Sequence, residues 1–222
     1  LLLMNVETYK QTKYQRFPFH SYIKEEWDIE HIDSQNEATG LRASEDRLRW
    51  MRLTSDILMK EHHAIPNEKE AKALAEELTS VVREKTENGA IEDKDVKGLD
   101  SIYPTLYVKV VEHYSGKISE QQGNKHALGN LTLLDTALNR SYQDAPFPYK
   151  RQCVMDTDLR GDKFVPMCTK NVFLKFYTNS NSSASFLDSM RWNKQDQDNY
   201  LAAIHKVVDP IFETNISKKS HE

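Results

Sequence analysis

The sequence predicts an α+β protein in which two short strands lie among helices. The first stretch, 27–32, alternates apolar and polar residues, as is typical of a strand with one buried face. The second, 131–134, is a short apolar run between a Gly-Asn pair and an aspartate. The two stretches lie about a hundred residues apart, and most of the chain around them has helical periodicity. We therefore expect a small two-stranded core with a helical insertion between its strands and a helical C-terminal region.

The composition is that of a polar globular protein. A chain of 222 residues is long enough for one sizeable core, or for a small catalytic unit with an inserted subdomain. No run of 18 apolar residues occurs, so no membrane span is expected, and the opening Leu-Leu-Leu-Met is too short for a signal peptide. The two cysteines, Cys153 and Cys168, are too few for a zinc knot and predict buried thiols in a reducing compartment.

The predicted core is split, because its two motifs lie on either side of the insertion. The three leucines at the start suggest a piece cut from a longer chain. In chain order, the expected parts are an aromatic lead-in (1–26), the split core (27–36 and 126–152), the helical insertion (37–125), a mainly helical C-terminal region (153–215) and a disordered tail (216–222).

The aromatic residues of the lead-in have two interpretations. They pack on the core, which we favour, or they form a stacking platform for nucleic-acid bases. They are Tyr9, Tyr14, Phe17, Phe19 and Tyr22. In the strand that follows, Trp27, Ile29 and His31 are expected on one side and Asp28 and Glu30 on the other, with the apolar side buried.

Three helices are predicted in the insertion. The first runs over 44–62 with Ser44 as its cap. The second starts at Asn67, where Glu70 completes a capping box. The third runs from Pro104, in its first turn, to residue 116. Each has apolar residues at three- and four-residue spacing and therefore one face suited to packing.

More helices are predicted after the second strand. Asp135 is expected to cap the first of them, and Pro146 and Pro148 to end it. Another helix is expected to start near 149–151, and a last one near Asn193.

The charge is uneven along the chain. The net charge of −4 does not favour nucleic-acid binding through bulk electrostatics. Residues 37–100 have 11 basic and 15 acidic side chains, whereas 136–175 have 7 basic and 4 acidic. The second region, which includes Arg140, suits a phosphate-bearing partner, and Arg140 is a candidate for contact with it.

The polar residues of the two motifs match the requirements of phosphodiester hydrolysis. The reaction needs an activated water and a cation that holds the phosphate and stabilises the leaving group. His31 is the candidate general base, and Glu30 beside it is a hard oxygen ligand. Asn130 opens the second strand, and Asn139, nine positions later, offers an amide oxygen as second ligand. Oxygen ligands favour Mg²⁺ or Mn²⁺ over zinc. A lone Glu-His pair is usually structural, whereas the four residues in this order favour catalysis.

At these residues the chain resembles the HNH (ββα-metal) nuclease superfamily, and most closely the C-terminal nuclease domain of GmrSD-type modification-dependent restriction proteins. The matching motifs are Glu30-His31-Ile32, Gly129-Asn130-Leu131-Thr132-Leu133-Leu134, Asn139, Phe147 and Lys150-Arg151. The resemblance implies a ββα-metal core. Two residues depart from the pattern: Ser34 stands where a proline is usual, and Asn139 is the third letter of the HNH motif.

The resemblance also implies a function, which is metal-dependent endonuclease cleavage of DNA in phage defence. His31 would be the general base, Glu30 and Asn139 would bind one Mg²⁺ or Mn²⁺ ion, and Asn130 would pin the loop and orient His31.

Further implications concern the substrate and the partners. Lys150 and Arg151 would hold phosphate or stabilise the fold. The expected partners are DNA, including modified phage DNA, and an upstream nucleotide-hydrolysing sensor domain in the full-length chain. The expected location is the bacterial cytoplasm.

Two other functions stay open. The chain could be a nucleic-acid or partner-binding module with a degenerate nuclease site, or an RNase on the same scaffold. The presence of all four motif residues argues against degeneracy. Asp28 has two equal interpretations, as a residue that supports Glu30 or as an exposed strand residue.

Overall fold

The computed structural model describes residues 1–33, 41, 43–65, 69–86, 99–115, 126–138, 145–177 and 189–219. Strand β1 (Trp27–His31) pairs antiparallel with β2 (Leu131–Asp135), so that Glu30 lies opposite Thr132 and His31 opposite Leu131. The remaining described elements are helical. This mostly helical architecture with a small sheet agrees with the predicted α+β class, and the pairing of the two motif strands is confirmed.

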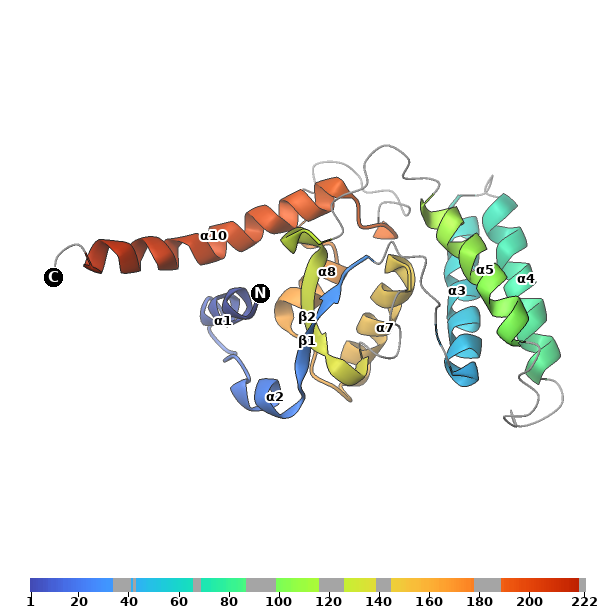
Figure 1. Cartoon of the computed structure of the whole chain (residues 1–222), viewed down its shortest axis with the longest axis horizontal. Coiled ribbons are helices and arrows are strands. Elements are labelled where there is room, and N and C mark those ends of the chain that lie inside the picture. The colour runs from blue at the N-terminus through green and yellow to red at the C-terminus, as the bar shows by residue number, and fades with distance from the viewer. Residues whose placement is uncertain are drawn as a thin grey trace.

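Three helices between the strands form a bundle beside the sheet. They are α3 (Ser44–Ala64), α4 (Lys69–Thr86) and α5 (Leu99–Ser115), which lie side by side at one end of the molecule (Figure 1). Trp50 of α3 is fully buried there, and its ring meets that of Tyr103 edge-on at 5.4 Å. Ser44 is the first helical residue of α3 and makes no capping hydrogen bond, so the predicted cap is wrong, and Asn67 lies outside the described residues.

Helix α5 begins five residues earlier than predicted and contains Pro104 in its interior. A proline at such a position removes a hydrogen bond and costs about 3 kcal/mol. The buried face begins upstream of it, however, with Leu99 and Tyr103, and continues through Leu106 and Val110. Burial of this continuous stripe outweighs the local cost, which is why the proline does not mark the helix start.

Burial along β1 does not alternate as predicted: Trp27 and His31 are half-buried, and Asp28 is exposed although it lies on the same side as Glu30. Glu30 is only 7% exposed, whereas Ile29 is 57% exposed. Glu30 is turned inward because an ammonium group, that of Lys150, is buried beside it. The buried ion pair therefore explains the burial of Glu30 itself, whereas Asp28 on the same side of the strand stays exposed.

The elements after β2 follow local signals closely. The Asp135 carboxylate accepts a hydrogen bond from the backbone N–H of Leu138 at 2.9 Å, so the predicted cap is confirmed. Helix α7 (Phe147–Arg160) starts directly after Pro146 and has Pro148 in its first turn. It ends at Gly161, which has a left-handed φ of 66°, and α8 (Met167–Phe173) follows.

The C-terminal helix α10 (Lys194–Lys219) extends away from the rest of the molecule (Figure 1). It starts one residue after the predicted position and continues into the stretch where we expected a disordered tail. Its first turn packs against the short helix η3 (Leu128–Asn130), where a Cβ added at Gly129 would lie 2.2 Å from the Gln197 carbonyl oxygen. The glycine of the second motif is therefore needed for this close approach of two backbones.

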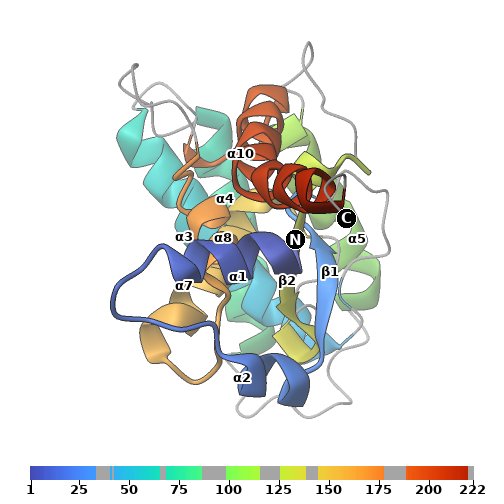
Figure 2. The same ribbon diagram turned by 90° about the vertical axis from the view of Figure 1, so that its left-hand side faces the viewer.

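The lead-in forms α1 (Leu2–Lys10) and α2 (Phe19–Lys24), which lie beside the sheet (Figure 2). Only some of its aromatic residues pack inside the protein as we expected. Tyr9 and Phe17 are buried and meet edge-on at 5.7 Å, whereas Tyr14 is 95% exposed. Of the helices in the described ranges, none is long and apolar enough to cross a membrane.

Candidate functional site

The two residues of the first motif lie at the end of β1, where α7 meets the sheet. The Lys150 ammonium, fully buried, forms an ion pair with the Glu30 carboxylate. The same ammonium donates a hydrogen bond to the His31 carbonyl oxygen at 2.8 Å. The first turn of α7 is thereby fastened to both residues, and Lys150 directs its charge into the protein.

Asn130 connects the start of β2 to the turn that follows β1. Its side-chain amide donates to the Asp33 carbonyl oxygen at 3.0 Å, and its side-chain oxygen accepts from the Asp33 backbone N–H at 3.1 Å. The Asn130 carbonyl also accepts from the Ile32 N–H at 2.9 Å. Asparagine supplies both a donor and an acceptor, so this residue type holds the turn from both sides.

Asp33 is a second acidic residue at this position, and the sequence analysis assigned no role to it. Its carboxylate accepts a hydrogen bond from the Phe147 backbone N–H at 3.2 Å, at the start of α7. Burial raises the pKa of Asp33 to about 6, although Lys150, this hydrogen bond and Lys175 all act in the opposite direction. Asp33 therefore titrates just below neutral pH. Only its position three residues after Glu30 could have pointed to it.

His31 is half-buried as a residue, with its ring Nε2 buried, and its ring approaches that of His126, with centroids 5.6 Å apart. The other predicted site residues divide as follows. Asp28 is exposed, and its carboxylate accepts a hydrogen bond from the Ile29 backbone N–H at 2.7 Å. Arg151 donates to the Phe173 carbonyl at 2.9 Å and so connects α7 to α8. Asn139 and Arg140 lie outside the described residues.

A further lysine, Lys175, connects the C-terminal region to the residues next to the site. Lys175, which has a left-handed φ of 61°, donates to the Arg191 carbonyl at 2.6 Å and forms an ion pair with Asp196. Its ammonium lies 5.3 Å from the centre of the Trp192 ring, and the Trp192 indole N–H donates to the Gly129 carbonyl at 3.1 Å. These contacts tie the C-terminal region to the second motif, and no sequence signal pointed to them.

The acidic residues of the site fit a cation only in part. Glu30 offers a carboxylate, but Lys150 already contacts one of its oxygens. Within the described part of the chain, no three His, Cys, Asp or Glu side chains are grouped so that they could hold a metal ion.

Comparison with known families places the chain among the restriction endonucleases. Residues 62–207 match the family model described as GmrSD restriction endonucleases, C-terminal domain, and the chain belongs to this family. The resemblance seen in the sequence is thereby confirmed. No curated protein and no solved structure matches the chain.

The matched span includes only part of the candidate site. Asn130, Asn139 and Lys150 lie within it, whereas Glu30 and His31 lie before its first residue. The structure brings Glu30 and His31 into contact with residues of the matched span through Lys150, and the turn after them through Asn130.

Proposed function

We propose that the chain is a metal-dependent HNH endonuclease that hydrolyses DNA phosphodiester bonds. The observation that carries the proposal is the junction of the two motifs. A glutamate and a histidine end β1, and an asparagine at the start of β2 holds the following turn by two reciprocal hydrogen bonds. In a restriction endonuclease family, this junction is the best supported location for the chemistry.

The proposed roles follow from these contacts. His31 acts as general base and takes a proton from the attacking water, since it is the imidazole that lies next to Glu30 at the end of β1. Glu30 and Asn139 would hold one Mg²⁺ or Mn²⁺ ion, which when bound would stabilise negative charge on the phosphate and the leaving oxygen. Asn130 positions His31 by fixing the turn directly after it. Lys150 holds the buried Glu30 carboxylate in place through their ion pair.

The ββα-metal arrangement belongs to the same proposal. Two antiparallel strands are followed by a helical turn at 136–138 and then by α7, whose Lys150 reaches the end of β1. We further infer a role in phage defence in the bacterial cytoplasm, with modified DNA as substrate and a nucleotide-hydrolysing sensor domain upstream in the full-length protein. Arg140 and Arg151 are proposed phosphate contacts.

One observation favours a second candidate function, a binding module with a degenerate nuclease site. The Lys150 ammonium occupies the position beside Glu30 that a cation would otherwise approach. If this ion pair persists in the presence of metal, the chain would bind nucleic acid without cutting it.

The decisive experiment is Mn²⁺-dependent cleavage of plasmid DNA, with an RNA substrate tested in parallel. His31→Ala and Asn139→Ala should each abolish cleavage, since loss of a general base costs about a hundredfold or more in rate. His205→Ala is a matched control, because His205 lies exposed on α10, and it should cut like the wild type. Activity that survives His31→Ala would refute the proposed base. A wild type that binds DNA without cutting it would support the binding module, and cleavage of RNA alone would identify an RNase.

A further inference from the structure

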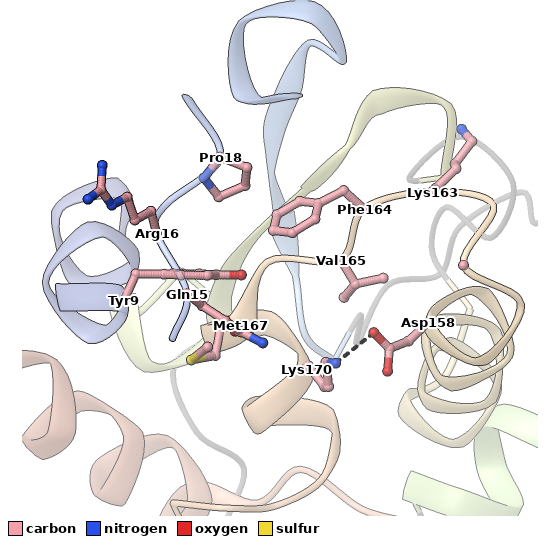
Figure 3. Close-up of a pocket in the computed structure, with 11 residues that line it drawn as sticks. Tyr9, Gln15, Arg16, Pro18, Asp158, Lys163, Phe164, Val165, Met167 and Lys170 are labelled. Atoms are coloured by element: carbon pink, nitrogen blue, oxygen red, sulfur yellow. Dashed lines mark ion pairs between the residues drawn. The ribbon is translucent and has the colours of Figure 1, made fainter. Parts of the chain in front are cut away.

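A pocket of about 530 Å³ lies between the lead-in and the connection from α7 to α8 (Figure 3). It lies at the opposite end of the sheet from His31. Phe164 in its wall stacks on Trp27, the first residue of β1, and Lys163 at its rim pairs with Asp135, the last residue of β2. A volume of this size is within the usual range for a small-molecule site.

One wall of the pocket is apolar and flat. The Phe164 ring is nearly parallel to the Trp27 ring, with centroids 5.4 Å apart and an interplanar angle of 6°. Figure 3 shows the Phe164 ring pointing into the pocket, with Val165 and Met167 below it. A planar guest placed against Phe164 would extend this stack by one ring.

Polar groups face this wall from the other side. Figure 3 shows the hydroxyl end of Tyr9 directed into the pocket, with Gln15 close to it. Asp158 and Lys170 form an ion pair at the base, with 2.7 Å between nitrogen and oxygen. Burial raises the pKa of Tyr9, and the charge of Asp158 raises it further, so the hydroxyl stays protonated at neutral pH and can donate.

This combination matches the edge and face of a nucleobase. An amide donates and accepts together, a carboxylate accepts from an exocyclic amino group, and a hydroxyl does either, which are the groups that proteins use to read base edges. Among the basic residues at the pocket, Lys163 is paired with Asp135 and Lys170 with Asp158, which leaves Arg16 as the side chain suited to attract a phosphate attached to the base.

We propose that this pocket binds one unstacked nucleotide, with its base against Phe164 and its edge read by Tyr9, Gln15 and Asp158. The inference deepens the proposed nuclease function and rests on it for the source of the nucleotide. Trp27, on which Phe164 stacks, lies four residue steps from His31 along β1, or about 14 Å. That distance is about four base steps of DNA, so the bound nucleotide lies a few positions from the scissile phosphate.

Two binding measurements on the 222-residue chain test the proposal. In the first, each deoxynucleoside 5′-monophosphate is titrated at millimolar concentration by calorimetry. In the second, a duplex with 2-aminopurine is added and its fluorescence is followed, because unstacking of this base raises the signal. We expect binding in at least one arm. A fluorescence rise identifies a base within a strand, and binding of monophosphates alone identifies a free nucleotide.

Variants then locate the binding. Phe164→Leu should weaken it about tenfold or more, since a base loses its aromatic partner, and Phe164→Tyr should restore it. Lys194→Ala, on exposed α10, is the control and should bind as the wild type. No binding in either arm, or equal binding by Phe164→Leu, overturns the proposal. The two proposals can fail separately. If His31→Ala still binds the nucleotide, the pocket proposal stands even when the wild type does not cut DNA. If the wild type cuts DNA but binds no nucleotide, the nuclease proposal stands and the pocket proposal fails.

Discussion

Replacement of Lys150 by methionine would expose the electrostatic cost of the site. The Lys150 side chain is 0% exposed and the Glu30 side chain 9%, so Lys150→Met leaves a buried carboxylate without its ammonium. Removal of one partner from a buried pair costs about 3–5 kcal/mol of unfolding free energy. The lost hydrogen bond to the His31 carbonyl adds about 1 kcal/mol. The double variant Glu30→Gln/Lys150→Met should recover all but about this last amount, because no buried charge remains.

Urea unfolding at pH 7, followed by circular dichroism, measures these differences. The deficit of Lys150→Met should shrink as the pH falls, because a buried carboxylate without its cation has a raised pKa and regains stability once protonated. Lys170→Met is the matched control: its pair with Asp158 is about one-third exposed on each side, so its loss should cost less than about 1 kcal/mol. A loss below about 1 kcal/mol in Lys150→Met, or a double variant no more stable than the single one, would refute the reasoning.

Three further substitutions test the contacts around the motifs. Gly129→Ala should lower the unfolding free energy by about 1–3 kcal/mol, because its Cβ would lie 2.2 Å from the Gln197 carbonyl. Gly161→Ala meets no atom within 4 Å and should cost about 1–2 kcal/mol from its left-handed φ alone. Equal thermal midpoints for Gly129→Ala and wild type would contradict the first expectation. Because the pKa of Asp33 is raised to about 6, the wild type should lose stability as the pH rises from about 4 to 6, by on the order of 2–3 kcal/mol. Asp33→Asn should remove this loss. A wild type with equal stability at both pH values would disprove it. Asn130→Asp cannot donate to the Asp33 carbonyl and should cost about 1–3 kcal/mol in urea unfolding, and an unchanged midpoint would argue against the clamp.

Features set by neighbouring residues could be predicted from the sequence. The Asp135 cap depends on a hydrogen bond from the backbone N–H three residues later, and an aspartate at this position is enough to predict it. The pairing of the two motif strands could be predicted because the polar residues of both motifs are needed to form one site, which requires the strands to lie side by side. The family was also identifiable, since its motifs are short and contiguous.

Features that depend on residues far apart in the chain could not be predicted from the sequence. Alternation in β1 predicted an exposed Glu30, and only Lys150, 120 residues later, explains its burial. Pro104 suggested a helix start, but packing of the upstream Leu99 and Tyr103 extends α5 past it. The nucleotide-sized pocket combines side chains from the lead-in and from the α7–α8 connection, and no local pattern relates these segments.

The order in which the chain is synthesised has a consequence for when the site can exist. Its halves are joined by contacts such as that between Asp33 and Asn130, 97 residues apart, and Gly129 is in turn packed against Gln197. At a translation rate of about 5–20 residues per second, the ribosome needs roughly ten to thirty seconds to proceed from the first strand to the helix that secures the second motif. During this interval a nascent chain already contains Glu30 and His31 but lacks the partners that hold them in place. The proposed endonuclease activity therefore cannot appear before the chain has been synthesised through Gln197.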